Sequence, residues 1–248
     1  MTTRPAIGSI TPSSNRVVER TLAGIMPLFP GIDSCVARIP YYGAGIGQPK
    51  DGYAEEPYRA AAWQLGHAAM EVVCWNGTRG AALGLAADRA LAAGMARAAG
   101  CKATTASLAT ANLLDAFGAR RIGIVTPSDA AYAAEAAAGL GRELAAMRAL
   151  DVASNHDASL VPAERIIALA REVAAEGQPD AILLWSTNLA GLTAVAPLEA
   201  ELGLPVIDSA AAGVWACLAA IGADMAPAVP LGRIFTIAGG CELILPEA

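Results

Sequence analysis

The chain has 248 residues, of which 55% are hydrophobic, and it carries a formal net charge of −6. The acidic balance and the lack of a basic stripe argue against nucleic acid as a partner, although backbone dipoles can still hold a small anion locally. No apolar run approaches the roughly 20 residues of a membrane span, and the N-terminus lacks the basic-then-apolar pattern of a signal peptide, so we expect a cytoplasmic protein without a membrane partner.

Short apolar runs alternate with alanine-rich segments along the whole chain. The runs lack strict alternation of apolar and polar residues, as expected for strands buried on both faces. The predicted strands lie, in chain order, near residues 6–11, 34–39, 70–75, 102–105, 121–126, 148–152, 181–186 and 205–209. The predicted helices lie near residues 15–27, 54–68, 80–99, 107–117, 130–146, 163–176, 189–201 and 210–221. This alternation predicts largely parallel sheets.

The sequence also repeats itself. An apolar run that breaks at Thr-Pro occurs first as Ile7-Gly8-Ser9-Ile10-Thr11-Pro12-Ser13-Ser14 and again as Ile122-Gly123-Ile124-Val125-Thr126-Pro127-Ser128-Asp129. A second matching pair consists of Val72-Val73-Cys74-Trp75-Asn76-Gly77-Thr78 and Ile182-Leu183-Leu184-Trp185-Ser186-Thr187-Asn188. Each copy ends in polar residues that lead into a helical segment, which is a suitable place for a small anion.

The repeat predicts an α/β fold of two similar Rossmann-like (flavodoxin-like) lobes with parallel sheets, related by a pseudo-twofold axis, with the active site in the cleft between them. We expect the first lobe to comprise residues 1–107 plus 215–248 and the second to comprise residues 108–214. A nucleotide-binding Rossmann protein is a weaker interpretation, because no Gly-rich fingerprint follows the first strand.

The cysteines do not form a metal site. None of the five lies in a CxxC motif, and only His67 and His156 accompany them, so no zinc-ligand spacing exists. We interpret four of them as reduced, buried thiols of a cytosolic protein. Cys74 is set apart because it lies three residues before a predicted site position, Gly77.

The longest Gly/Pro-rich segment is Tyr41-Tyr42-Gly43-Ala44-Gly45-Ile46-Gly47-Gln48-Pro49. It does not open directly into a helix, so it is not a phosphate-binding GxGxxG loop. Two interpretations stay open, a plain surface loop and a mobile lid over the site.

Four loops should converge at the carboxyl ends of the strands, where α/β folds bind ligands. The first is Pro12-Ser13-Ser14-Asn15, whose side chains can cap the next helix or hold a carboxylate. The second is Asn76-Gly77-Thr78-Arg79-Gly80, where glycine lets the backbone approach a ligand and Thr78 offers a hydroxyl. Arg79 is either a fixed positive charge for that ligand or a solvated side chain.

The second half of the chain supplies the other two loops. Thr126-Pro127-Ser128-Asp129 offers the Ser128 hydroxyl, while Asp129 fits a helix cap. Ser186-Thr187-Asn188 likewise precedes a helical segment.

Taken together, these loops resemble the aspartate/glutamate racemase superfamily, and in particular its branch of maleate cis-trans isomerases and arylmalonate decarboxylases. The opening through Pro12-Ser13-Ser14-Asn15 resembles the start of the isomerases, including the asparagine that contacts substrate in that family. Gly77-Thr78-Arg79-Gly80 stands where the isomerases carry Cys-Thr-Ser-Gly and the decarboxylases carry Gly-Thr-Ser. Three further parts of the chain resemble the decarboxylases: Asp180-Ala181-Ile182-Leu183-Leu184, Leu202-Gly203-Leu204-Pro205-Val206-Ile207, and Ser209 with Gly213 and Trp215.

The departures from the family pattern concern its thiols. The resemblance implies two cysteines, one per lobe, in the racemases and isomerases, and only the second in the decarboxylases. Here these positions are Gly77 and Ser186, and the family tyrosine after the second-lobe strand is replaced by Ser128. A serine hydroxyl is a much weaker acid and nucleophile than a thiol with a pKa near 8.5, unless a base activates it. Two-thiol racemisation is therefore not expected: either Ser186 takes the place of the relay thiol, or a shifted loop presents Cys74.

The sequence thus predicts a cradle of polar groups for a small carboxylate. Its catalytic positions are Ser186, Gly77 and Thr78, and its binding residues are Pro12, Ser13, Ser14, Asn15, Arg79, Ser128, Thr187 and Asn188. We expect an isomerase or lyase that acts on a small carboxylate or dicarboxylate, without cofactor or metal, through donors placed where negative charge develops. The alternative is a non-catalytic carboxylate-binding protein on the same fold. A homo-oligomer is compatible with both.

Overall fold

Two four-stranded parallel sheets form the framework of the protein, which a computed structural model describes for residues 4–40, 49, 52–152 and 154–246. The first sheet has the strand order β2-β1-β3-β4 and the second β6-β5-β7-β8, so both share one topology. The strands are β1 (Ala6–Pro12), β2 (Asp33–Ile39), β3 (Val72–Trp75), β4 (Lys102–Thr105), β5 (Arg121–Thr126), β6 (Glu143–Ala149), β7 (Ala181–Leu184) and β8 (Val206–Asp208). The predicted fold class is confirmed.

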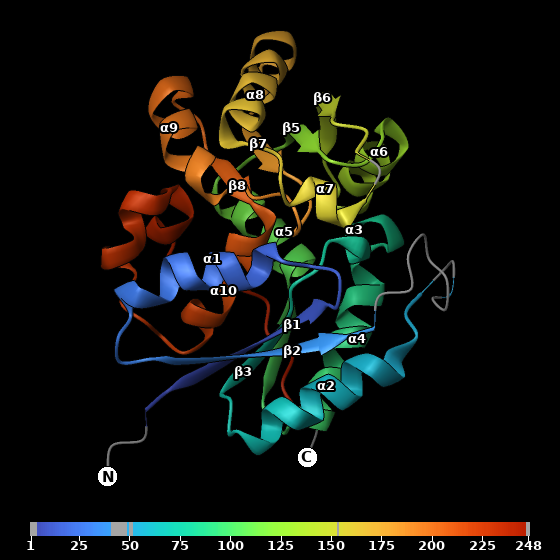
Figure 1. Cartoon of the computed structure of the whole chain (residues 1–248), viewed down its shortest axis with the longest axis vertical. Coiled ribbons are helices and arrows are strands. Elements are labelled where there is room, and N and C mark those ends of the chain that lie inside the picture. The colour runs from blue at the N-terminus through green and yellow to red at the C-terminus, as the bar shows by residue number, and fades with distance from the viewer. Residues whose placement is uncertain (1–3, 41–48, 50–51, 153, 247–248) are drawn as a thin grey trace.

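Helices cover both sheets, and each sheet with its helices is called a lobe below (Figure 1). The helices are α1 (Val17–Ile25), α2 (Glu55–His67), α3 (Arg79–Leu83), α4 (Leu85–Ala99), α5 (Ala106–Ala116), α6 (Ala130–Gly139), α7 (Asn155–Ala158), α8 (Ala163–Gly177), α9 (Leu192–Leu202) and α10 (Ser209–Ala220). Short 3₁₀ turns are η1 (Met26–Leu28), η2 (Ala226–Leu231) and η3 (Arg233–Thr236). Within the described residues, no helix has both the length and the apolar character needed to cross a bilayer.

The internal repeat corresponds to equivalent strands. β1 and β5 occupy the same place in their sheets, and each pairs with the strand that carries the second half of the repeat. Ile7 pairs with Val72 of β3, and Ile122 pairs with Ala181 of β7. The predicted equivalence of the segments that contain Ile7 and Ile122 is therefore confirmed.

One of the three apolar clusters among the described residues joins the two lobes. It contains Ile7 and Cys74 from the first sheet, Ile124 and Leu183 from the second, and much of α5 and α10. These two helices are the crossovers, since α5 follows β4 and leads to β5, and α10 follows β8. The chain then returns to the first sheet, where Ile244 forms an antiparallel bridge beside β4. Because the core is continuous, the loops at the strand ends are held in a fixed relation across the lobes.

Two predicted elements have the wrong bounds, namely the helix at residues 130–146 and the strand at residues 148–152. The helix α6 ends at Gly139, and β6 already begins at Glu143. Gly141 adopts a left-handed conformation with φ of +67°, which turns the chain out of the helix. The alanine-rich residues that follow favour a helix when taken alone, but pairing with β5 places them in a strand.

The helix predicted for residues 80–99 is two helices. Gly84 has φ of +90°, which no α-helical residue adopts, and it separates α3 from α4. The break leaves α3 as a single short turn directly after the second predicted loop.

Candidate active site

All four predicted loops follow the carboxyl ends of the two neighbouring central strands in each sheet. The first follows β1, the second β3, the third β5 and the fourth β7. In both sheets these pairs flank the point where the strand order reverses, which is where open α/β sheets bind ligands.

Asn15 caps a helix, which is one of the two functions predicted for it, and it also makes a contact across the lobes that was not predicted. Its Oδ1 accepts hydrogen bonds from the N–H groups of Val17 and Val18, at 2.8 and 3.0 Å, at the start of α1. Its Nδ2 donates to Thr187 in the other lobe, at 3.1 Å to the carbonyl oxygen and 3.2 Å to Oγ1. The side chain is only 2% exposed. The cap fixes the amide so that its donor group faces the fourth loop.

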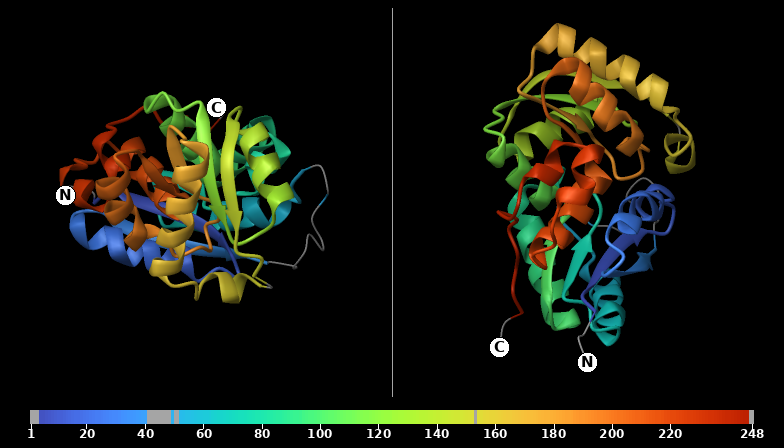
Figure 2. Two further views of the ribbon diagram at one scale, coloured as in Figure 1. Left: turned by 90° about the horizontal axis from the view of Figure 1, so that it is seen from above. Right: turned by 90° about the vertical axis from the view of Figure 1, so that its left-hand side faces the viewer.

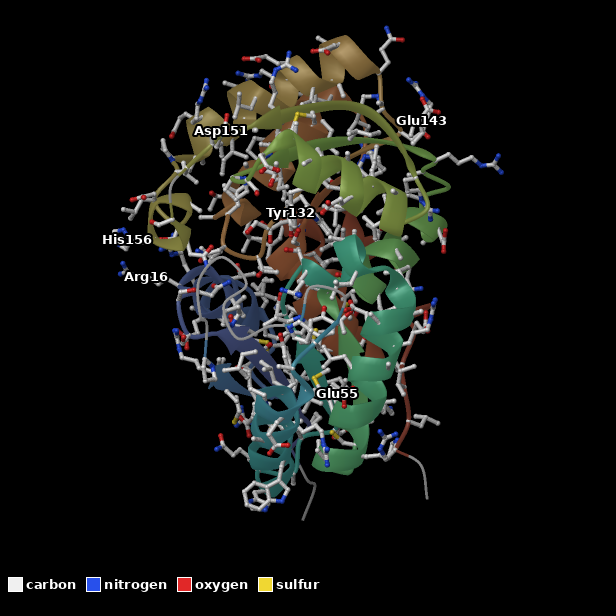
Figure 3. The ribbon with its side chains drawn as sticks, turned by 90° about the vertical axis from the view of Figure 1, so that its right-hand side faces the viewer. Arg16, Glu55, Tyr132, Glu143, Asp151 and His156 are labelled. Atoms are coloured by element: carbon white, nitrogen blue, oxygen red, sulfur yellow. The ribbon has the colours of Figure 1, made fainter. Side chains whose placement is uncertain are left out.

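A short chain of hydrogen bonds continues this contact at the edge of the site. Asn155 at the start of α7 donates from Nδ2 to Ser14 Oγ at 2.8 Å, and its carbonyl accepts from Asn188 Nδ2. Asn188 Oδ1 accepts from the backbone N–H of Arg16 at 3.2 Å. Figure 3 shows Arg16 and His156, next to Asn155, at this edge where the two lobes meet.

Thr78 makes a further direct contact between the lobes. Its Oγ1 lies 2.8 Å from the hydroxyl of Tyr132, which comes from the first turn of α6. Figure 3 shows Tyr132 at the level where the two halves of the molecule meet. Burial raises the pKa of Tyr132 to about 12, while contacts with Thr78 and Trp185 lower it. The phenol is therefore a neutral hydrogen-bond donor at ordinary pH.

Gly77 lies against an indole ring. A Cβ atom placed on Gly77 would come within 2.5 Å of two ring carbons of Trp75 and 2.9 Å of its Nε1. The indole N–H is buried and has no hydrogen-bond partner among the described residues. The space that a side chain at Gly77 would occupy is therefore filled by Trp75, which leaves an unpaired donor there.

The equivalent residue of the second lobe, Trp185, is similar. It directly precedes Ser186 and is fully buried. Its indole N–H lies near the Tyr132 hydroxyl without the geometry of a full hydrogen bond. The two lobes thus each place a buried indole N–H at the end of a central strand.

Arg79 and Ser128 lie apart from these contacts. The Arg79 guanidinium donates to the carbonyl oxygens of Pro49 and Gly52, the latter at 3.1 Å, so it anchors the segment that follows the Gly/Pro-rich stretch. Residues 41–48 of that stretch lie outside the described residues, and both interpretations of it stay open. The Ser128 residue is exposed, and its N–H donates to Thr126 Oγ1 at 3.2 Å.

Ser186 and Cys74 differ in their access to the site. Ser186 is half-buried, and its Oγ accepts a hydrogen bond from the N–H of Asn188 at 3.1 Å. Cys74 lies within β3 in the shared core and is 0% exposed. Contact with Cys217 and burial raise the pKa of the Cys74 thiol well above its usual range. A buried thiol of raised pKa is a poor nucleophile.

Sequence reasoning identified the loops but missed three residues that complete them: Tyr132, Trp75 and Asn155. Tyr132 carries a detectable signal, because Asp129 caps α6 by accepting from its N–H at 2.8 Å. That cap places Tyr132 in the helical turn that opens at the third loop. Trp75 carries a second signal, because the repeat aligns it with Trp185. No comparable signal marks Asn155, whose contacts are with Ser14 and Asn188.

The site contains no evident metal-binding cluster. Within the part of the chain that the structure describes, no three His, Cys, Asp or Glu side chains gather in a way that could hold a metal ion. The groups that do gather are hydroxyls, amides and indole N–H donors, which suit an anion.

Comparison with known proteins identifies the family. The sequence profile of the arylmalonate decarboxylase family matches residues 46–235. The arylmalonate decarboxylase of Bordetella bronchiseptica is 30% identical over 243 residues, which cover 93% of this chain and 96% of that protein. This chain belongs to the arylmalonate decarboxylase/maleate isomerase family of the Asp/Glu racemase superfamily. The maleate isomerase of Nocardia farcinica is 31% identical over 125 residues, which cover 49% of this chain and 49% of that protein.

Solved structures of this family have the same fold. A maleate isomerase from Pseudomonas putida S16 with maleate superposes with a TM-score of 0.84 at 19% identity, covering 96% of this chain and 99% of that one. A liganded double mutant of arylmalonate decarboxylase, with glycine changed to cysteine and cysteine to serine, superposes with a TM-score of 0.76 at 25% identity. The match covers 88% of this chain and 93% of that one.

Proposed function

We propose that this protein is a cofactor-independent lyase that removes CO₂ from a small malonate-type dicarboxylate. The observation that carries the proposal is the Thr78–Tyr132 hydrogen bond, which brings neutral donors from both lobes together at the strand ends. Loss of CO₂ leaves an electron pair that spreads over the remaining carboxylate as an enediolate. Preorganised donors stabilise that charge as it develops.

The absence of a thiol in the four loops favours a lyase over an isomerase. None of the five cysteines lies in residues 12–16, 76–80, 126–129 or 186–188. Cleavage of a C–C bond to CO₂ requires no base to remove a proton from carbon, and it needs only one acid afterwards. Isomerisation needs a nucleophile or a base, and a cysteine-to-serine mutant of a Nocardia farcinica maleate cis-trans isomerase carries a covalently bound succinylcysteine intermediate.

The proposed roles follow from the placement of the donors. Thr78, Thr187 and the indole N–H of Trp75 hold the carboxylate oxygens, and Asn15 holds Thr187 in place. Ser186 lies beside them as a further hydroxyl. Arg79 holds the neighbouring segment in place rather than the substrate, because its guanidinium already binds two carbonyl oxygens.

CO₂ release from phenylmalonate, methylmalonate and malonate, measured beside calorimetric binding of the same compounds, tests the proposal. We expect turnover of at least one malonate in metal-free buffer with a chelator present. Binding without release of CO₂ would instead favour a carboxylate-binding protein, and conversion of maleate to fumarate would favour the isomerase.

The variant Thr78→Ala tests the cradle itself. Removing one hydrogen bond to a charged group costs about 1.5–3 kcal/mol, so affinity for the bound dicarboxylate should fall roughly ten- to a hundred-fold. Thr236→Ala is the matched control, since Thr236 lies on η3 outside the four loops and its hydroxyl donates to the Arg233 carbonyl oxygen at 2.7 Å. Unchanged affinity in Thr78→Ala would remove Thr78 from the site.

A further inference from the structure

We propose that the hydroxyl of Tyr132 is the acid that protonates the carbanionic carbon left by decarboxylation. This role rests on the proposed function and goes beyond it, because it assigns the proton to a residue on α6 and not to Ser186 in the fourth loop. The evidence is the place of the phenol between the two lobes and the chemistry of the groups around it.

The phenol lies between the ends of the two central strands. Its hydroxyl contacts Thr78, just after β3, and lies near the indole of Trp185, just after β7. Gly77 and Ser186 are the sequence neighbours of these two residues. A substrate held by donors from both loops therefore has the Tyr132 hydroxyl within the same set of contacts.

The position of the phenol is rigid. Asp129 caps α6 directly at Tyr132, and α6 packs closely on α3 of the other lobe. A Cβ atom on Gly139 of α6 would overlap the carbonyl oxygen of Ala81 in α3, which shows how near the two backbones lie. A proton donor must be held in hydrogen-bond reach of its target, and this packing supplies that constraint.

The surroundings keep the phenol protonated until it is needed. Burial and the carboxylate of Glu135 raise its pKa, while Thr78, Trp185 and Arg79 lower it. Once the proton is given up, the resulting phenolate accepts a hydrogen bond from Thr78 and faces the Trp185 N–H. The carbanionic carbon of an enediolate is a far stronger base than a phenolate, so the transfer is downhill despite the raised pKa.

The alternatives in the site are poorer acids or are out of reach. Ser186 Oγ accepts a hydrogen bond from the Asn188 N–H, and an aliphatic hydroxyl is a weaker acid than a phenol. Cys74 is enclosed in the core beside Cys217. Of these three groups, Tyr132 is thus the one that combines contact with the cradle and sufficient acidity.

The step balances without a co-reactant other than water. The C–C bond to the leaving carboxylate breaks, CO₂ departs, and the electron pair enters the enediolate. The Tyr132 O–H bond breaks as the new C–H bond forms, which gives a monocarboxylate and a phenolate. Water then returns a proton to the phenolate, and the hydroxide produced is neutralised by buffer.

The test compares Tyr132→Phe with the wild-type protein. Removing only the hydroxyl should lower kcat on phenylmalonate by roughly 100-fold or more, the usual contribution of a general acid. Affinity for phenylacetate, the product, measured by calorimetry, should change by less than roughly tenfold, the value of one neutral hydrogen bond. Tyr58→Phe is the matched control because Tyr58 is buried behind Trp75 and outside the four loops.

A pH profile separates a phenol of raised pKa from any donor that loses its proton between pH 7 and 10. An acid whose pKa is near 12 stays protonated from pH 7 to 10, so kcat of the wild-type protein should be flat over that range. A thiol of ordinary pKa near 8.5 would lose its proton within it. A fall of kcat centred near pH 8.5 would overturn the role of Tyr132.

Two further outcomes would also overturn it, in distinguishable ways. If the wild-type protein decarboxylates a malonate and a folded Tyr132→Phe variant does so within a few-fold, the proposed function stands and Tyr132 is not the acid. A larger loss of kcat in Ser186→Ala than in Tyr132→Phe leads to the same conclusion and identifies Ser186 as the acid. If the wild-type protein binds malonates and releases no CO₂, both proposals fail together.

Discussion

At the scale of single residues, Gly77 and Trp75 form one unit. The indole fills the volume beside the Gly77 Cα, and it is held from behind by Tyr58, whose ring meets it edge-on at 4.8 Å between centroids. Tyr58 in turn meets Tyr53 at 5.2 Å. Because this aromatic stack is buried, the indole cannot move aside without disturbing the core behind it. Glycine at this position is therefore required by packing, whatever chemistry the site performs.

Gly77→Cys should consequently destabilise the protein. Overpacking of a filled site costs about 1–3 kcal/mol, and the free energy of unfolding from urea titration should fall by that amount. Trp75→Leu opens the space, so the double variant should show a favourable coupling of about 1 kcal/mol in a double-mutant cycle. Additive effects of the two changes would contradict the proposed clash. It also follows that installing paired thiols through Gly77→Cys and Ser186→Cys requires a third change at Trp75.

At the scale of elements, α10 begins at a buried carboxyl group. Asp208 ends β8 and accepts a hydrogen bond from the N–H of Ala211 at 2.8 Å, which caps the helix. The residue is 0% exposed, and its Oδ2 has no partner of good geometry among the described residues. Burial raises the pKa of Asp208 to about 7, against the opposing effect of backbone N–H groups. The cap of this crossover helix is thus sensitive to pH.

The sign of the effect on stability follows from the raised pKa. The folded protein holds the Asp208 proton up to about pH 7, whereas the unfolded chain releases it near pH 4, so the stability contributed by the protonated form is lost as pH rises from about 4 to 7. Asp208→Asn keeps the cap and removes the charge. Its free energy of unfolding relative to the wild-type protein should be higher at pH 8 than at pH 5, by at most about 3 kcal/mol. An equal difference at both pH values, in urea titrations, would show that Asp208 does not titrate there.

The elements also show how far sequence alone leads. The strands at 102–105 and 121–126 were predicted residue for residue. β5 is a short apolar run, whereas β4 (Lys-Ala-Thr-Thr) is marked by two β-branched threonines between two helical segments. β6 was misplaced because its alanine-rich composition favours a helix until β5 pairs with it. The loops of the site were predicted from the repeat, whereas Tyr132 and Trp75 were not, since their contacts with Thr78 and Gly77 exist only once the chain has folded.

At the scale of the whole molecule, the two lobes are connected in two ways. The crossovers α5 and α10 pack together in the shared core, and the right-hand view in Figure 2 shows the orange-red α10 between the two lobes. The loops at the strand ends add polar contacts, from Asn15 to Thr187 and from Thr78 to Tyr132. The core determines the relative placement of the lobes, and the polar contacts lie where a ligand would add to them.

A bound carboxylate should therefore protect loops of both lobes at once. At a ligand concentration of 100 times Kd, binding stabilises the native state by about 2.7 kcal/mol, which hydrogen exchange detects as slower exchange. With phenylacetate bound, we expect the largest slowing of exchange in residues 12–18 and 76–83 of the first lobe and in residues 127–133 and 185–190 of the second, and a smaller change in the outer helix α8. Asn15→Asp keeps the cap on α1 but cannot donate to Thr187, so ligand-induced protection of 185–190 should fall selectively. Protection confined to the loops of one lobe would contradict a shared site and place the ligand on that lobe alone.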